Sequence, residues 1–299
     1  MQELVDSAGL AGNGEELRRR LAADGYLFLR GVLPADLVAE AGAAVARRLA
    51  AGGWTDGRGV PSATPRAVTV PEALRDRAYL TALAGREFNQ IPYLPELRGL
   101  IGRLLGSGAF PYPAKVLRAI YPERGGARSG GRYVHQDYGG AGIQDMLTSW
   151  VPLMDIPAEV GGLAVLPGGH LGPPRLPRVL GPAALRWATT GYRPGDVLVF
   201  HCLLPHAALP NTVGVLRLSG DFRWQVPAGP APIEMVYGPS SRPPELFSRL
   251  FRRQPWWQPV PAGLDLRPRA ELAGRPPGPS RFFPVHPAWR LWRKPAALR

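Results

Sequence analysis

Hydrophobic residues recur at helical spacing in the first third of the chain. Leu17 and Leu21 lie four residues apart and predict one buried face of a helix over residues 15–24. A strand bounded by glycines is predicted next, at residues 25–31. Further helices are predicted at residues 33–53, 71–83 and 94–106, with a polar loop at 53–70. Residues 1–112 are therefore predicted to be mainly helical.

From residue 114 onward the pattern changes to short apolar runs separated by glycines, prolines or polar turns. Strands are predicted at residues 114–123, 132–137, 146–155, 162–168, 196–202 and 215–225, with a loop at 124–131. Several short strands with turn signals between them are typical of a β-sandwich or a jelly-roll barrel. We therefore expect one α+β domain over residues 1–299, with N-terminal helices packed on a β-core at residues 113–226.

The C-terminal part, residues 227–299, is rich in proline and arginine. We expect a largely irregular segment that wraps the core, with a disordered tail as the alternative. Its aromatic residues favour packing, because large aromatic side chains are usually buried. They are Trp256, Trp257, Phe282, Phe283, Trp289 and Trp292. This segment, residues 53–70 and residues 86–93 are candidates for a lid over a pocket.

The net charge of +13 raises the question of a nucleic-acid partner. Nearly all of the positive charge is arginine, since Lys115 and Lys294 are the only lysines. The arginines are scattered through a sequence rich in alanine, glycine and proline, which indicates a compositional bias. We therefore expect no nucleic-acid partner.

Cysteine content and hydropathy favour a cytoplasmic protein. Cys202 is the only cysteine, so an intramolecular disulfide is impossible, as expected in a reducing compartment. The N-terminus carries acidic residues and lacks the apolar core of a signal peptide. No run of about 18 apolar residues is present, so we expect no membrane span. The oligomeric state is not indicated.

The stretch RYVHQDYGGAG places His135 and Asp137 two residues apart on a predicted strand. Residues i and i+2 of a strand share a face, so an imidazole and a carboxylate converge there. They supply two-thirds of the facial triad of non-haem iron(II) oxygenases, which is weak evidence by itself. His201 and His206 both qualify as the third ligand, although His201 is more simply a hydrogen-bonded wall residue.

A dicarboxylate cosubstrate needs a buried guanidinium, because only arginine offers a fixed and permanently charged fork. Arg217 and Arg223 are both candidates and share a face on an uninterrupted strand. A solvated or salt-bridged surface residue is the simpler interpretation of either one.

Five stretches, in this order, resemble the phytanoyl-CoA dioxygenase family, whose members use iron(II) and 2-oxoglutarate. They are GYLFLRGVLPADLV at the N-terminus, LRGLIGRLLG, VHQD, SWVPLMDIPAEVGGLAVLPGGH, and PGDVLVFHCLLPHAALPN followed by Arg217. The resemblance spans most of the chain and includes the eleven-residue spacing from His206 to Arg217. It implies a double-stranded β-helix, also called a jelly-roll or cupin-like core.

The resemblance also implies a role for individual residues. The metal ligands, which are also the catalytic residues, become His135, Asp137 and His206. Arg217 becomes the partner of the cosubstrate, and Trp150 lines the cosubstrate pocket, with plain core packing as the alternative. A carboxylate at position 137 argues against the related halogenases, which carry a small residue there.

The sequence departs from the family pattern where some members carry a serine hydroxyl for the cosubstrate. That position, two residues after His206, is Ala208. Ser219 is one candidate to replace the hydroxyl, and Thr148 and Ser149 are others. Lys115 lies on a predicted strand, and its side chain points either towards the pocket or towards solvent.

The resemblance implies an enzyme that uses iron(II), 2-oxoglutarate and dioxygen to hydroxylate an unactivated C–H bond of a small molecule. We expect a substrate from natural-product metabolism. The same chemistry with a different outcome gives epimerisation, desaturation or ring closure. Two other classes are a metal-free binding protein on this fold and a nucleic-acid demethylase.

Overall fold

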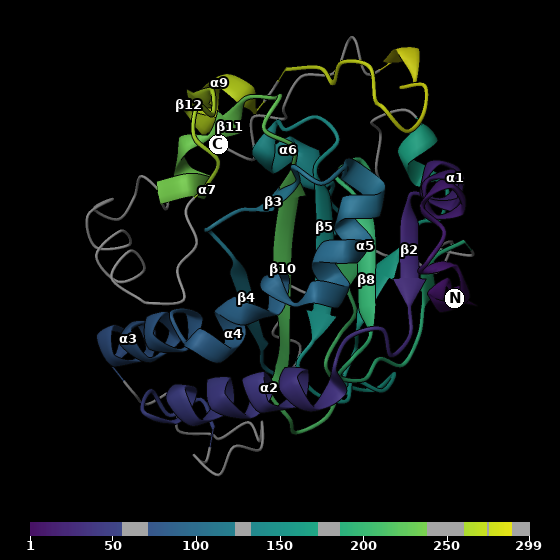
Figure 1. Ribbon diagram of the computed structural model, residues 1–299. Helices are drawn as coiled ribbons and strands as arrows, with labels where there is room; N and C mark the ends of the chain where they lie inside the picture. The colour runs from purple at the N-terminus through teal and green to yellow at the C-terminus, as the bar shows by residue number, and fades with distance from the viewer. Residues whose placement is uncertain (56–70, 123–132, 173–185, 238–259, 274, 289–299) are drawn as a thin grey trace.

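The computed structural model confirms that helices come first and sheets follow (Figure 1). It describes residues 1–55, 71–122, 133–172, 186–237, 260–273 and 275–288. Within these residues, helices combine with sheets whose strands are mostly antiparallel, so the α+β class is confirmed. The domain boundaries stay a prediction.

The four predicted N-terminal helices are confirmed. They are α1 (Gly14–Asp24), α2 (Ala35–Ala50), α3 (Glu72–Leu83) and α5 (Pro95–Leu105), with α4 (Arg86–Gln90) between the last two. The Asn13 side chain caps α1 by accepting a hydrogen bond from Glu16 N at 3.1 Å. Gly25 ends α1 at φ 80°, a conformation that glycine adopts without strain.

The remaining helical elements are short. They are α6 (Asp137–Ala141), α7 (Ile233–Tyr237), α9 (Arg269–Leu272) and the 3-10 turns η1 (Ala8–Leu10), η3 (Ile91–Tyr93) and η5 (Gly169–Leu171). In the part of the chain that the structure describes, no helix is long and apolar enough to cross a membrane. The cytoplasmic location stays a prediction.

The larger sheet has six strands, all paired antiparallel. Its strands are β2 (Tyr26–Leu29), β3 (Phe110–Pro111), β4 (Val116–Ile120), β5 (Leu147–Pro152), β8 (Val197–His201) and β10 (Arg217–Gln225). The order is β2-β8-β5-β10-β3, and β4 also pairs with β10. β10 therefore has neighbours on both sides and lies inside the sheet, as Figure 1 shows.

The second sheet has the order β1-β7-β6-β9. Its strands are β1 (Gln2–Glu3), β7 (Ala188–Thr189), β6 (Leu163–Val165) and β9 (His206–Ala208). A parallel pair, β11 (Ala231–Pro232) with β12 (Leu266–Arg267), lies near the C-terminus. The two main sheets share a cluster of buried side chains, including Phe28, Trp150 and Phe200 from the larger sheet and Val165 from the second. They therefore face each other.

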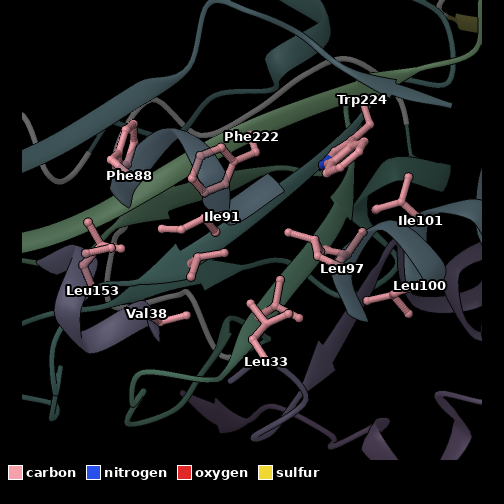
Figure 2. Close-up of a cluster of buried hydrophobic side chains, with 14 of the residues drawn as sticks. Leu33, Val38, Phe88, Ile91, Leu97, Leu100, Ile101, Leu153, Phe222 and Trp224 are labelled. Carbon is pink, nitrogen blue, oxygen red and sulfur yellow. The ribbon is translucent and has the colours of Figure 1, made fainter. Parts of the chain in front are cut away.

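The other face of the larger sheet packs against α2, α4 and α5 (Figures 1 and 2). Leu218, Phe222 and Trp224 of β10 point to this side and are almost completely buried. The Phe88 ring of α4 lies 5.3 Å from the Phe222 ring. Residue 220 is glycine because a Cβ there would come within 2.8 Å of both rings.

Alternation along β10 decides what faces the second sheet. Since Leu218, Phe222 and Trp224 face the helices, the residues between them face the other way. These are Arg217, Ser219, Asp221 and Arg223. A row of polar and charged groups thus lies on the inner face between the two sheets.

The prediction of a strand at residues 132–137 is wrong at its C-terminal end. His135 forms an isolated antiparallel bridge, and Asp137 begins helix α6. Tyr138 N donates to Cys202 O at 2.9 Å, and Gly142 ends the helix at φ 66°. A local sequence pattern cannot reveal this contact with a distant segment, so the i, i+2 rule does not apply here.

Part of the C-terminal segment packs on the core. Phe283 is 7% exposed, and the Ser280 hydroxyl donates to Asp145 Oδ1 at 2.6 Å. The wrapping segment is therefore confirmed for this part. Trp256, Trp257, Trp289, Trp292, the loop predicted at 124–131 and residues 56–70 lie outside the described residues.

The suggestion that residues 86–93 form a lid is not supported. Phe88 and Ile91 are buried in the cluster on the helix-covered face of the larger sheet. This is the opposite face from the polar row on β10.

Candidate metal centre

Two histidines from distant segments face each other across the isolated bridge. His135 N donates to His206 O at 3.1 Å, and His206 N donates to His135 O at 3.0 Å. Residues paired directly in this way point their side chains to the same side. The two ring centroids lie 4.2 Å apart as a result.

Each imidazole is held in one tautomer by a backbone carbonyl two residues earlier. His135 Nδ1 lies 3.3 Å from Tyr133 O, and His206 Nδ1 lies 3.0 Å from Leu204 O. A carbonyl oxygen only accepts hydrogen bonds, so the geometry assigns the proton to Nδ1 in both rings. Nε2 of each ring therefore keeps its lone pair for a metal ion.

Asp137 brings a carboxylate oxygen to the same point. Its Oδ1 lies 3.8 Å from His135 Nε2 and 3.9 Å from His206 Nε2. Oδ2 accepts a hydrogen bond of 2.7 Å from Thr148 Oγ1. The ligand atoms of His135, Asp137 and His206 all lie within 4.8 Å of one another. Among the described residues, this is the only group of His, Cys, Asp or Glu side chains that could hold a metal ion.

The protonation states suit a divalent cation. Burial would raise the pKa of Asp137, but the Arg223 guanidinium, the two imidazoles and the Thr148 hydrogen bond hold this pKa well below its usual range. Burial and the neighbouring His135 lower the pKa of His206 to about 4. At neutral pH the cluster therefore contains a carboxylate and a neutral His206, which are the forms that bind metal.

We expect Thr148→Val to weaken metal binding by about 10- to 100-fold, the usual effect of losing an outer-shell partner. Valine keeps the volume but removes the donor to Asp137 Oδ2, so only the longer contacts from Arg223 still orient the carboxylate. Thr148→Ser keeps the hydroxyl and is the matched control. Calorimetric titration with Co²⁺ measures both variants, and equal affinities would contradict this role.

Arg217 is a buried guanidinium without a carboxylate partner among the described residues. The residue is 2% exposed, and its Nη1 donates to the carbonyls of Gly161 and Leu209. Its Nε has no hydrogen-bond partner. Burial lowers the pKa of Arg217 to about 10, and the nearby Arg118 adds to this effect. The Asp221 carboxylate offsets part of this effect, but it is itself bonded to Arg118, so the site suits an additional anionic ligand.

The three candidate hydroxyls have different surroundings. Thr148 is bonded to Asp137. Ser149 accepts from Trp224 Nε1 at 2.9 Å and donates to Phe222 O at 3.3 Å. Ser219 is fully buried, its Oγ has no partner, and it lies two residues from Arg217 on the same face of β10. Of the three, Ser219 alone has a hydroxyl available beside Arg217.

Trp150 lies on the inner face of β5, opposite Asp221 of β10. It is 2% exposed, and its ring meets the Tyr192 ring nearly edge-on at 4.7 Å. The alternative of core packing is therefore present in the structure. A contact with the cosubstrate stays a prediction.

His201 belongs to a different cluster. Its Nε2 lies 3.2 Å from Asp145 Oδ1, and its Nδ1 accepts from Leu203 N at 3.1 Å. Asp145 also accepts hydrogen bonds from Ser280 and Arg281 N. Both ring nitrogens of His201 are thus engaged, and the residue anchors the C-terminal segment to the core.

Lys115 does not face the polar row. It directly precedes β4, where Val116 pairs with Asp221 and Leu117 faces the helices, so alternation turns Lys115 towards the helices as well. Its ammonium lies 5.5 Å from the centroid of the Tyr93 ring. The orientation towards the pocket is therefore not supported.

Two charged contacts on the inner face were missed from the sequence. Arg118 of β4 donates to Asp221 Oδ2 through Nε at 2.9 Å and through Nη2 at 2.7 Å. Arg223 contacts both oxygens of Asp137, at 3.3 and 3.4 Å. The alternation along RLSGDFRWQ places Asp221 and Arg223 on one face of the strand. Only the pairing of β4 with β10 shows that Arg118 meets Asp221.

The chain matches the model of the phytanoyl-CoA dioxygenase (PhyH) family over residues 21–218. The chain belongs to the phytanoyl-CoA dioxygenase family. The matched range contains all three residues of the candidate metal cluster and extends just past Arg217. The resemblance seen in the sequence is thereby confirmed.

Among curated relatives, 1-deoxypentalenic acid 11-beta-hydroxylase of Streptomyces exfoliatus is 28% identical over 251 residues, which cover 75% of this chain and 86% of that protein. The enzyme with the same name from Streptomyces arenae is 27% identical over 250 residues and covers 75% of this chain and 85% of its own length. The family match shows an oxidoreductase, and both of these relatives are hydroxylases by name.

Solved structures agree with this assignment. The epimerase SnoN in complex with Fe3+, alpha ketoglutarate and nogalamycin RO has 25% sequence identity and a TM-score of 0.53, covering 74% of this chain and 86% of that one. EctD from S. alaskensis, with 19% identity and a TM-score of 0.52 over 90% of this chain and 92% of that one, shares the fold. This member of the phytanoyl-CoA dioxygenase family is an iron(II)- and 2-oxoglutarate-dependent oxygenase that acts on a small molecule.

Proposed function

We propose that His135, Asp137 and His206 hold the iron(II) through Nε2, Oδ1 and Nε2. The observation that carries this proposal is the convergence of these atoms within 4.8 Å. Two imidazoles and one carboxylate are the ligand set that suits non-haem iron(II), and they leave coordination positions open.

Arg217 and Ser219 bind the far carboxylate of 2-oxoglutarate in this proposal, and Trp150 lines the space beside it. Support comes from the buried Nε of Arg217 and the buried Oγ of Ser219, neither of which has a partner. Iron(II) with bound 2-oxoglutarate supplies the oxidant by coupling decarboxylation of the keto acid to reduction of dioxygen, with succinate and carbon dioxide released. The apolar wall of Trp150, Phe200 and Tyr192 excludes water from this side.

The two facing sheets support a double-stranded β-helix as the finer description of the core. In such a core the inner faces of both sheets line one space. His206 opens β9 of the second sheet and Arg217 opens β10 of the larger one. The site would then lie between the sheets, with the helices on the outer face of the larger sheet.

Hydroxylation of an unactivated C–H bond in a natural-product metabolite is the reaction that we propose. The two curated relatives are hydroxylases. Epimerisation is a second candidate, because SnoN is an epimerase; desaturation and ring closure belong to the same chemistry. The substrate approaches past His135, whose side chain is 38% exposed, rather than past His206, which is 5% exposed.

Anaerobic titration with iron(II), followed by oxygen and 2-oxoglutarate, tests this function. We expect one iron per chain and succinate formation that requires both the metal and the keto acid. With 1-deoxypentalenic acid as the probe, a product that gains one oxygen atom indicates hydroxylation, and an isomer of unchanged mass indicates epimerisation. Absence of both iron binding and succinate would overturn the proposal.

A further inference from the structure

The inner faces of the sheets carry more positive than negative charge. Among the described residues, Arg118, Arg217 and Arg223 contribute guanidiniums, whereas Asp137 and Asp221 contribute carboxylates. The two histidines proposed as metal ligands are neutral when they bind a metal ion, so they add no charge. The described residues therefore leave one positive charge over, three guanidiniums against two carboxylates.

Binding of the cofactor and the cosubstrate does not remove this excess. Iron(II) brings two positive charges and 2-oxoglutarate brings two negative ones, so they cancel. A net charge in a largely buried site is costly. The remaining group that enters this site is the substrate, and a single negative charge on it would restore balance.

The distances show which guanidinium is least committed. Arg118 binds Asp221 at 2.7 and 2.9 Å. Arg217 lies deep in the core and faces the proposed carboxylate of 2-oxoglutarate. Arg223 contacts Asp137 at only 3.3 and 3.4 Å, and that carboxylate is the proposed metal ligand. Arg223 therefore retains the most capacity for another anion.

Exposure also favours Arg223. Its side chain is 19% exposed, whereas Arg217 is 2% exposed. Next to the same cluster, Tyr133 is 49% exposed, and its ring stacks on His135 at 6.1 Å and 22°. Arg223 at Asp137 and the Tyr133 ring at His135 thus flank the same metal cluster.

We propose that the substrate is an apolar molecule with one carboxylate, and that Arg223 binds this carboxylate beside the metal centre. The inference rests on the proposed function and adds the substrate class and its anchor. The guanidinium fork matches a carboxylate through two hydrogen bonds. The carboxylate would then fix which part of the apolar body lies next to the iron.

Matched pairs of acids and methyl esters test this proposal on the full chain. The probes are 1-deoxypentalenic acid, dehydroabietic acid and adamantane-1-carboxylic acid, each beside its ester. Dissociation constants are measured anaerobically on protein saturated with iron(II) and 2-oxoglutarate, whose own binding is titrated first. We expect at least one acid to bind, and every acid that binds to do so more tightly than its ester.

Arg223→Gln removes the charge but keeps a hydrogen-bonding side chain of similar length. We expect this variant to weaken binding of the acid by at least about 30-fold and to leave the ester within a few-fold, because a lost charge partner costs about 2 kcal/mol or more. Arg223→Lys should recover part of the preference for the acid. These readouts are substrate affinities, so a merely structural role of Arg223 would not produce them.

Three results would overturn the inference. They are failure of every acid to bind, equal binding of acid and ester, or an equal loss of both in Arg223→Gln. Failure of the proposed function is distinguishable from these, since it appears earlier as failure to bind iron(II) or 2-oxoglutarate.

Discussion

Asp137→Asn is expected to lower the affinity for iron(II) by more than about 100-fold. Asp137 is itself a proposed ligand, so the loss should exceed the roughly 10- to 100-fold cost of losing a group that only orients a ligand. Succinate formation should fall with the metal occupancy. Asparagine keeps the shape of the side chain and can still accept the hydrogen bond from Thr148. It lacks the negative charge that balances a dication beside Arg223, which lies 3.3 Å away. Charge, rather than shape, is thus the property that this variant removes.

Asp145→Asn is the matched control for this variant. Asp145 is also a carboxylate bonded to a histidine, but its partner is His201, outside the metal cluster. Its φ of 55° is a conformation that asparagine also tolerates. We expect the control to lose thermal stability and to keep its iron affinity. Equal iron affinity in Asp137→Asn and the wild type would refute the proposed ligand set.

Arg217→Met should abolish the response to 2-oxoglutarate while leaving iron(II) binding within a few-fold of wild type. We expect the KM for 2-oxoglutarate to rise at least about 30-fold, because the far carboxylate of 2-oxoglutarate loses its buried charge partner. Without ligands, the free energy of unfolding of the variant should lie within about 1 kcal/mol of the wild-type value, because the substitution removes a buried charge that Asp221 offsets only in part. This combination of lost binding and retained stability is characteristic of a binding residue.

Thermal denaturation with and without 2-oxoglutarate measures both effects. The wild type should be stabilised by the keto acid and Arg217→Met should not, since a ligand stabilises only the state that binds it. Arg217→Lys keeps the charge without the planar fork and should give an intermediate shift. If Arg217→Met keeps its affinity for 2-oxoglutarate and Arg223→Met loses it, then Arg223 rather than Arg217 binds 2-oxoglutarate.

Local pattern was sufficient for the elements that bury one regular face. Leu17 and Leu21 of α1 are completely buried, as the four-residue spacing predicts. The alternation along β10 likewise separates Phe222 from Arg223. Such periods arise from backbone geometry within one segment, so they can be read without knowledge of the partner.

Local pattern failed where a partner far along the chain decides the conformation. Asp137 lies in a helix rather than on a strand, because Tyr138 N bonds Cys202 O from a segment more than sixty residues away. His135 and Asp137 still converge, although not for the reason that their spacing suggests. The bridge to His206 positions the His135 ring, and the Thr148 hydroxyl and Arg223 hold the Asp137 carboxylate.

By itself, the sequence indicated the family and its cofactors, because short motifs in a fixed order carry this information. Through the same resemblance it predicted His206 and Arg217 as site residues, and these two roles stay predictions. The tertiary structure decided the surroundings of these residues: Thr148 on Asp137, Arg223 beside the metal cluster, and Arg118 on Asp221. These partners come from strands whose register is set by packing across the sheets. No spacing along one segment specifies which charges meet between two sheets.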